Sequence, residues 1–431
     1  MLAKTVVWAE PIENLMTALR AHILELVAEG NAETKLWPDA LTFVAALAQQ
    51  CWINDYLYAL TAEEEEQLKT IEKRASFETF ETAVLGCYRR LYQQEYADTL
   101  LENADPLLSD VLRVQIREPR EEEEIKSKLE ELTSIDDEIS LIVKEQYETF
   151  PYPRWIDTAI ERPVTLAYLL NNQFPGLSLE HLPPADLKPE ILIAGCGTGR
   201  QAVENAMLLQ NSNITAIDIT ASSLAYAVRK TQELGMANIR YGLADILKLE
   251  ELGQSFDLAM CGGVLHHMQD PMAGWKVLNK ITKPGGFMSI ALYSEIARRY
   301  IAQAQELIDQ QGITNDEAGI REFRAQIKQL PDSNPLKGLI DHRDFYSIPE
   351  CRDMLFHVQE HRFTALSLEK SMEELGLEFL GFQNLPASVR RDYKKHFPED
   401  AHLTNLKNWH EFELQNSTIF KGMYQFWCRK P

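Results

Sequence analysis

The sequence predicts an α/β protein in which a doubly wound parallel sheet follows an all-helical N-terminal domain. Three observations support this fold class. Apolar residues recur at helical spacing from Pro11 to about Phe150, and beyond about Lys188 short apolar runs alternate with helical stretches. A mostly helical stretch then separates Tyr293 from Leu377, far longer than an ordinary connection between strands. This alternation implies helices on both faces of the sheet and ligands at the carboxyl ends of its strands.

The length and composition are those of a globular protein with two or three domains. The chain has 431 residues, of which 45% are hydrophobic and 25% charged, which excludes a largely disordered or collagen-like chain. We expect an acidic helical domain at residues 1–145 and a linker and lid segment at 146–187. The sheet domain follows at 188–431, with a helical cap insertion at about 294–376.

Negative charge is concentrated at the front of the chain. The formal net charge is −22, and residues 1–150 contain 31 acidic but only 14 basic side chains. Nucleic acids are bound by clustered Lys and Arg, so this distribution predicts that the protein does not bind nucleic acid.

The cysteines and the apolar runs predict a soluble cytoplasmic protein. Six cysteines lie far apart without a C-x-x-C pair, as expected for reduced thiols. The N-terminus shows no secretory leader, and no apolar run approaches the roughly eighteen residues of a membrane span. Membrane partners are therefore not expected, and the sequence does not predict an oligomeric state.

Two features organise the helical front. Residues 43–52 and 80–89 resemble each other at a spacing of about 37 residues, close to the period of helical repeats. Pro151 and Pro153 prevent a helix from continuing, so a domain border is expected around residues 150–155. Beyond that border, strands are expected at residues 191–194, 214–218, 256–261, 287–293, 377–382 and 422–430, with one more ending at Asp245 and a helix at 222–234.

A glycine-rich loop and two acids predict a nucleoside site. The first strand is followed directly by Gly195-Cys196-Gly197-Thr198-Gly199, and a helix is expected from about Arg200. Glycines let the backbone approach a ligand, and the start of a helix offers free N–H groups to an anionic group. Asp218 ends the second strand, where a carboxylate can accept both ribose hydroxyls, and Asp245 ends the third, where it can accept from an adenine amino group.

This pattern resembles the class I S-adenosylmethionine-dependent methyltransferases, which have a Rossmann-like sheet. A nicotinamide enzyme fits less well, because its third glycine normally falls one residue later, where this chain has Arg200. The resemblance spans roughly residues 188–293 and includes the runs Phe256-Asp257-Leu258, Val264-Leu265-His266-His267-Met268 and Lys283-Pro284-Gly285-Gly286. The helical front and residues 147–155, 344–363 and 420–427 resemble a narrower bacterial group with a tetratricopeptide-like N-terminal region, for which no substrate is implied.

The resemblance implies that S-adenosylmethionine is the cofactor. The glycine loop would hold its methionine part, Asp218 its ribose and Asp245 its adenine. The residues expected to bind it are Gly195, Cys196, Gly197, Gly199, Asp218, Ile219, Asp245, Ile246, Cys261, Tyr147 and Arg154. Tyr147 and Arg154 would close over the donor, with Arg154 paired to its carboxylate; an ion pair between domains is the alternative for Arg154.

The residues after the fourth strand bear on the methyl acceptor. Methyltransferases of amides and nucleobase amines carry an Asn or Asp followed by two prolines, whereas this chain has Cys261-Gly262-Gly263-Val264. An oxygen, an aliphatic nitrogen or a carbon acceptor is therefore favoured. The residues expected to move a proton or orient the substrate are His266, His267, His357, Glu360, His361, Tyr293 and Tyr346.

The run from His357 to His361 reads H-x-x-E-H, the spelling of the inverted zinc-protease signature. Two histidines four apart on a helix share a face, but a catalytic zinc needs a third ligand that the sequence does not identify. No metal is therefore predicted. A half-buried cap helix is one interpretation of the run, and a polar cluster facing the substrate is the favoured one.

Three functions are compatible with these features. The first is an enzyme that methylates a small molecule enclosed by the insertion. The second is a protein methyltransferase whose acidic helical front binds a basic polypeptide. The third is a non-catalytic donor-binding protein, against which the intact glycine loop and both acids argue.

Overall fold

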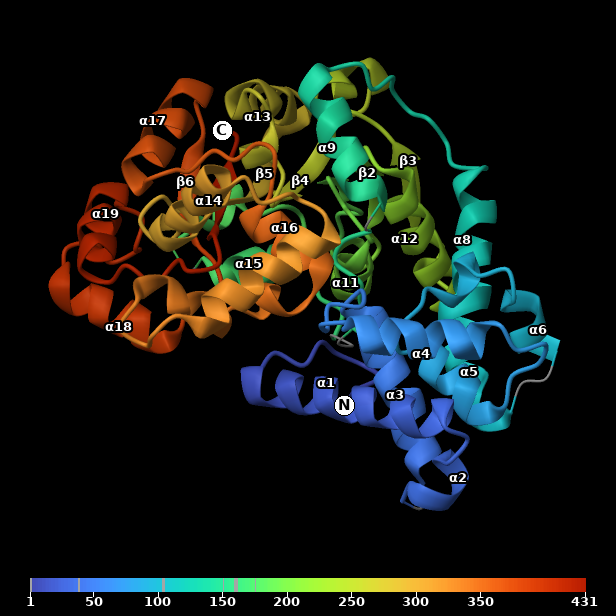
Figure 1. The fold of residues 1–431 in the computed structure, drawn as a ribbon. Helices are drawn as coiled ribbons and strands as arrows, with labels where there is room; N and C mark the ends of the chain where they lie inside the picture. The colour runs from blue at the N-terminus through green and yellow to red at the C-terminus, as the bar shows by residue number, and fades with distance from the viewer. Residues whose placement is uncertain (1, 38, 103–104, 150, 159–161, 175) are drawn as a thin grey trace. The chain divides into compact units, whose positions relative to one another are not determined.

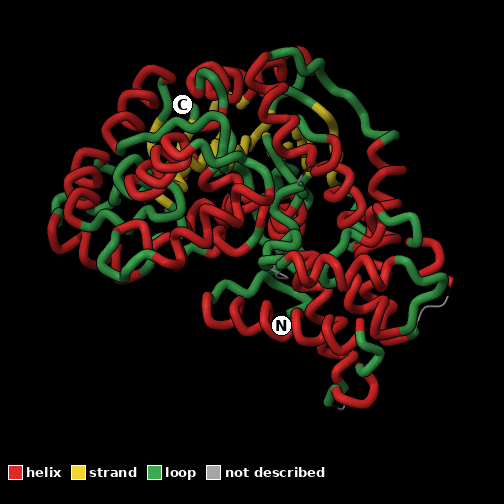
Figure 2. Tube along the Cα trace, viewed as in Figure 1, coloured by secondary structure: helices red, strands yellow, loops and turns green. Residues whose placement is uncertain are grey.

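The computed structural model describes residues 2–431 except 38, 103–104, 150, 159–161 and 175. The chain divides into two compact units, each built from separate stretches of sequence (Figure 1). The helical unit comprises Met1–Glu124, Tyr152–Asp157 and Tyr300–His357, and the sheet unit comprises Ile125–Pro151, Thr158–Arg299 and Val358–Pro431. Figure 2 shows the strands, in yellow, lying among the helices of the sheet unit.

The helical unit confirms the all-helical character of the front region. Its α-helices are α1 (Glu10–Ala28), α2 (Ala32–Lys35), α3 (Ala40–Ile53), α4 (Ala62–Glu72), α5 (Thr79–Leu85), α6 (Ala97–Glu102), α7 (Ser109–Leu112) and α8 (Glu118–Lys126), with α14 (Arg299–Gln311), α15 (Glu317–Gln329) and α16 (Ile348–Leu355) from the insertion. Short 3₁₀ helices lie at η1 (Leu91–Gln93), η2 (Pro106–Leu108), η7 (Pro335–Asp341) and η8 (Arg343–Tyr346), and η3 (Arg113–Arg117) is a π-helical stretch.

Local sequence explains how these helices begin. Thr61 forms a capping box with Glu64 at the start of α4, and acidic residues in the first turn of this helix complement its positive dipole end. The two similar segments form α3, of 14 residues, and α5, of only seven. A tetratricopeptide-like repeat is therefore not confirmed.

The sheet has seven strands in the order β3-β2-β1-β4-β5-β7-β6. The strands are β1 (Glu190–Ala194), β2 (Asn213–Asp218), β3 (Ile239–Leu243), β4 (Phe256–Gly262), β5 (Thr282–Leu292), β6 (Glu378–Phe382) and β7 (Tyr424–Arg429). Strands β1 to β5 pair in parallel, as predicted. The last strand, β7, runs antiparallel to both β5 and β6, so the sheet is mixed at this edge. The start of β7 lies beside the end of β6, where the N–H of Gln383 donates to the carbonyl oxygen of Gln425.

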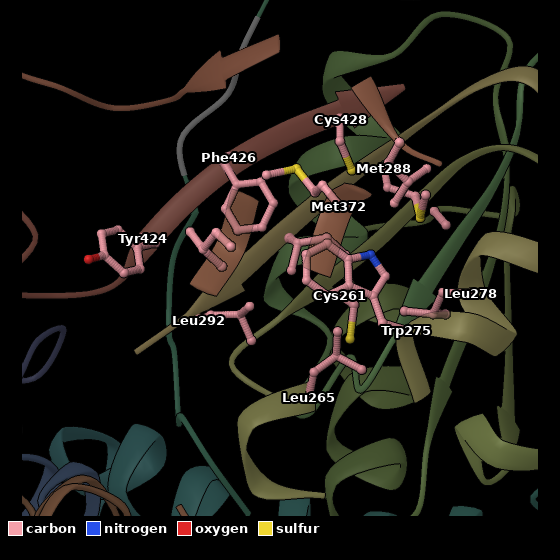
Figure 3. Packing of buried hydrophobic residues seen from close by; sticks show 14 of the residues in the cluster. Cys261, Leu265, Trp275, Leu278, Met288, Leu292, Met372, Tyr424, Phe426 and Cys428 are labelled. Carbon is pink, nitrogen blue, oxygen red and sulfur yellow. The ribbon is translucent and has the colours of Figure 1, made fainter. Parts of the chain in front are cut away.

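Helices cover both faces of the sheet, which confirms the doubly wound architecture. Successive residues of β1 point to opposite faces: Leu192 packs with one buried cluster and Ile193 with another. Helices α13 (Pro271–Ile281), α17 (Ala365–Leu375) and α19 (Leu406–Gln415) cover the first face, and α10 (Leu166–Gln173), α11 (Arg200–Leu208) and α12 (Ala221–Glu233) the second. Figure 3 shows part of the first cluster. The unit also contains α9 (Glu138–Thr149), α18 (Ala387–His396) and the short turns η4 (Leu179–His181), η5 (Ile246–Leu252) and η6 (Leu265–His267).

The division into units differs from the domain limits expected from sequence. The sequence predicts that residues 125–145 belong to the helical domain, but this segment pairs with β3: the N–H of Leu132 donates to the carbonyl oxygen of Leu243 at 2.8 Å, and the N–H of Leu243 donates to that of Glu130 at 2.8 Å. Most of the insertion, residues 300–357, packs with the front helices, because Arg324 pairs with Glu13 at 2.8 Å. The border expected around residues 150–155 includes Phe150, which lies outside the described residues.

Candidate functional site

The glycine loop lies at the carboxyl end of β1, as predicted, and leads into α11. Gly195, Gly197 and Gly199 all have positive φ angles, of 74°, 51° and 79°. A Cβ atom at Gly195 would overlap the side chain of Val264, so only glycine fits there. The N–H groups of Gly195 and Cys196 donate to the carbonyl oxygen of Ile217 at 2.9 and 2.8 Å, which fixes the loop beside the end of β2.

Asp218 ends β2 and faces this loop. One carboxylate oxygen accepts from the N–H of Gly197 at 2.8 Å, and the other accepts from the N–H and hydroxyl of Thr220 at 2.9 and 2.6 Å. Burial raises the pKa of Asp218. A carboxylate offers about four acceptor positions, so Asp218 keeps capacity for a ligand hydroxyl.

Asp245 follows β3 and has one oxygen that the described protein leaves unbonded. Its N–H donates to the hydroxyl of Thr133 at 2.9 Å, and its Oδ1 accepts from the N–H of Leu247 at 2.9 Å. Its Oδ2 is buried and has no hydrogen-bond partner among the described residues. Because a buried acceptor normally finds a donor, this oxygen fits the amino group of an adenine ring. Ile246, the next residue, is buried at the start of η5.

Helix α9 brings Tyr147 to the same edge of the sheet. Its neighbour Glu148 accepts from the N–H of Ala221 at 3.0 Å and from the hydroxyl of Ser222 at 3.0 Å, at the start of α12. Helix α9, which carries Tyr147, is thus held at the start of α12, three residues after Asp218. Sequence reasoning missed Glu148 and Thr133, because neither belongs to a motif with fixed spacing.

His266 and His267 form a buried aromatic cluster with Tyr293. Both histidines lie in η6 after β4, and Tyr293 directly follows β5. The ring centroids of His266 and Tyr293 are 3.8 Å apart, and those of His266 and His267 are 4.2 Å apart. The guanidinium of Arg298, another residue missed from sequence, lies 3.5 Å from the Tyr293 ring.

His267 is neutral in the folded protein. Burial lowers its pKa to about 3. Its Nδ1 lies 2.7 Å from the carbonyl oxygen of Gln359, which can only accept, so Nδ1 carries the proton. The other ring nitrogen, Nε2, is then a hydrogen-bond acceptor.

The run from His357 to His361 is not helical, so the half-buried cap helix, one of the two interpretations of this run, does not form there. Helix α16 ends at Leu355, and the following backbone is irregular up to α17. The N–H of His361 donates to the carbonyl oxygen of His266 at 2.7 Å, and the N–H of Phe363 donates to that of Tyr293 at 2.8 Å. These partners at the strand ends replace the bonds of a helix, so the two histidines do not share a helix face.

Glu360 is held in a buried ion pair. Its carboxylate accepts two hydrogen bonds from Arg298, at 2.6 and 3.1 Å, and the guanidinium of Arg362 lies 3.5 Å away. The side chains of Glu360 and Arg298 are only 5% and 4% exposed. This geometry suits a residue that holds its neighbours in place better than one that accepts a proton.

Four predicted residues have other surroundings. Arg154, Tyr346 and His357 belong to the helical unit. Arg154 donates to the carbonyl oxygen of Trp52 at 3.0 Å, and Tyr346 donates to that of Ile340 at 2.9 Å. Burial raises the pKa of Tyr346 to about 12.

The fourth residue, Cys261, has its side chain in the core near Leu265 and Trp275, as Figure 3 shows. Only its backbone is left for a ligand. All six cysteines are buried and free. Among the described residues, no helix is both long and apolar enough to span a membrane.

Comparisons with known proteins agree with this geometry. Residues 189–317 match a family described as "Methyltransferase domain". An uncharacterised protein of Synechococcus is 37% identical over 211 residues, which are 46% of this chain and 49% of that protein. A ubiquinone biosynthesis O-methyltransferase of Paracidovorax citrulli is 30% identical over 112 residues, 26% of this chain and 46% of that enzyme. The chain thus spans about half the length of these relatives.

A solved structure is also similar. PKMT2 from Rickettsia typhi is 16% identical with a TM-score of 0.45, and the match covers 62% of this chain and 53% of that one.

Proposed function

We propose that this chain, in which residues 189–317 form a class I, S-adenosylmethionine-dependent methyltransferase domain, methylates a small molecule at an oxygen, an aliphatic nitrogen or a carbon. The observation that carries the proposal is the unbonded Oδ2 of Asp245, buried where an adenine amino group is expected. S-adenosylmethionine, the cofactor of this domain, supplies an electrophilic methyl group when it is bound. The protein must then hold the donor, align the acceptor and exclude water.

The donor would be held by three parts of the sheet edge. The N–H groups at the start of α11 and the glycine loop, whose backbone a ligand can approach closely, would bind the methionine part of S-adenosylmethionine. Asp218 suits the ribose hydroxyls, since both of its oxygens already lie at the end of β2 in fixed positions. Tyr147 on α9 is proposed to border the same site. Arg154 donates to the carbonyl oxygen of Trp52 within the helical unit, and its pairing with the carboxylate of the donor is proposed from the sequence alone.

His267 and Tyr293 are proposed to orient the acceptor. The Nε2 atom of His267 can accept a hydrogen bond from an acceptor hydroxyl, and its low pKa keeps the ring neutral. A base with a pKa near 3 removes protons poorly at neutral pH, so we propose orientation rather than full proton abstraction. The pair of Glu360 with Arg298 would hold the Tyr293 ring in place. His266, His361, His357 and Tyr346 remain candidates for direct contact with substrate.

Two further observations support an oxygen or carbon acceptor. Gly262, the last residue of β4, and Gly263 stand where methyltransferases of planar amines carry prolines, and a Cβ atom at Gly263 would meet open space. Relatives of residues in this domain are named as ubiquinone biosynthesis O-methyltransferases and as a ubiquinone/menaquinone C-methyltransferase.

The second candidate is a protein methyltransferase. The excess of acidic residues in 1–150 would favour a basic polypeptide at the helical unit. A non-catalytic donor-binding protein is the third candidate, and the intact donor residues argue against it.

One experiment separates these candidates. The protein is incubated with methyl-labelled S-adenosylmethionine and fractionated cell lysate, and an Asp218→Ala variant serves as the matched control. We expect label in the small-molecule fraction with the unaltered protein and a loss of at least tenfold with the variant. Label in polypeptides would support the second candidate. Calorimetric donor binding without any transfer would support the third.

A further inference from the structure

The helical unit contains a polar cavity that is independent of the donor residues. Its volume is about 230 Å³, and every residue that lines it belongs to the helical unit. Its lining includes three arginines and three tyrosines: Arg20, Arg90, Arg321, Tyr56, Tyr58 and Tyr88. We propose that this cavity binds a small aromatic anion, with a carboxylate or phosphate group among the guanidinium groups and a ring among the tyrosines.

Two buried side chains in the cavity wall have unused hydrogen-bonding atoms. Arg20 and Tyr58 are each only 3% exposed. The Nε of Arg20 and the hydroxyl of Tyr58 have no hydrogen-bond partner among the described residues. Buried donors in folded proteins are normally bonded, so a ligand that accepts hydrogen bonds would complete this wall.

The cavity wall is rich in cations although the surrounding chain is acidic. Four arginines line it, Arg20, Arg89, Arg90 and Arg321, against one carboxylate, Glu317. The acids that hold Arg89 do not line the cavity: Glu72 and Glu65 bind this guanidinium at 2.7 and 2.9 Å from outside the wall.

Asp55, likewise not a lining residue, binds Arg90 at 2.9 Å. Carboxylates outside the wall therefore hold two of the guanidinium groups in position. Planar guanidinium groups suit carboxylate and phosphate oxygens.

The tyrosines supply surfaces for an aromatic ring. The guanidinium of Arg20 lies 4.0 Å from the Tyr88 ring and 5.7 Å from the Tyr58 ring. Asp55 and Tyr56 have φ angles of 57° and 58°, a strained conformation that sets the direction of the chain into the cavity wall. The Nη2 of Arg321 donates to the carbonyl oxygen of Tyr56 at 2.7 Å, while its Nε has no partner among the described residues. These contacts hold the tyrosine rings and the guanidinium groups in fixed positions around the cavity.

Phenyl phosphate and benzoate are suitable probes for the full-length protein. Calorimetry at constant ionic strength should show one saturable site for at least one of them, and the tighter probe distinguishes phosphate from carboxylate chemistry. Tyr58→Phe removes only a hydroxyl that the protein itself does not use. We therefore expect at least a fivefold loss of probe affinity without a fall in thermal stability. Arg321→Gln should weaken binding at least tenfold.

Matched controls are Tyr92→Phe and Arg113→Gln, which alter the same unit at residues that do not line the cavity. Both should leave probe affinity within twofold of the unaltered protein. Failure of both probes to bind up to about 10 mM would overturn the proposal. Binding that neither Tyr58→Phe nor Arg321→Gln weakens would also overturn it. None of these outcomes depends on methyl transfer.

Discussion

Replacement of Asp245 by Asn tests the donor site at a single atom. In Asp245→Asn the retained oxygen can still accept from the N–H of Leu247, so the start of η5 should keep its cap. The change replaces Oδ2, which has no partner among the described residues, by an NH₂ group. A donor would then face the adenine amino group, which is itself a donor.

The magnitude follows from the charge of the lost acceptor. A hydrogen bond to a charged group contributes about 1.5–3 kcal/mol, so donor affinity should fall roughly 10- to 150-fold. Protein stability should change little, because Oδ2 has no hydrogen-bond partner among the described residues that the substitution could remove.

Titration calorimetry with S-adenosylmethionine measures the affinity, and urea unfolding measures the stability. Asp270→Asn is a matched control, since Asp270 caps α13 by accepting from the N–H of Met272 at 2.9 Å and is exposed. We expect the control to bind the donor normally. Unchanged affinity in Asp245→Asn would refute the assignment of adenine to this residue.

Three further predictions concern stability and use urea unfolding of the full chain. Gly195→Ala should lower the free energy of unfolding by about 3 kcal/mol, because the φ angle at this position is positive and the added Cβ atom overlaps Val264. A second change, Val264→Ala, should recover part of this loss. An unaltered urea midpoint for Gly195→Ala would contradict the loop geometry. Arg298→Met should lower the free energy of unfolding by about 3–5 kcal/mol, because it removes the ion-pair partner of the buried Glu360. The double variant Arg298→Met, Glu360→Gln should recover more than half of this loss. Equal losses in the single and the double variant would argue against the ion pair. Burial raises the pKa of Glu350 to about 7 from 4.5, so the folded state binds more protons than the unfolded state between these pH values. The stability of the protein should therefore fall by about 3 kcal/mol as pH rises from 4.5 to 7. Glu350→Gln should flatten this dependence of stability on pH, and an identical slope in the variant would count against the pKa shift.

The strands and the donor loop could be predicted because their signals are local. Buried parallel strands appear as short apolar runs, and the loop after β1 needs glycines where φ is positive. Asp218 and Asp245 then follow from their places at strand ends.

Other features depend on partners distant in sequence. A half-buried helix is one interpretation of the run from His357 to His361, but the N–H groups of His361 and Phe363 donate to the carbonyl oxygens of His266 and Tyr293. The reversal of β7 and the bond from Asp245 to Thr133 likewise depend on residues that no spacing rule connects.

The pairing of Glu13 with Arg324 has a consequence for biosynthesis. The two residues are separated by 311 positions, and Glu13 also binds Lys328 at 2.7 Å. At about 5–20 residues per second, a ribosome would add Arg324 roughly 16–62 s after Glu13. During that interval the nascent front helices carry a carboxylate whose basic partners do not yet exist. The helical unit, although it begins at the N-terminus, therefore completes the ion pairs between its front helices and the insertion only after the strands β1 to β5 have been translated.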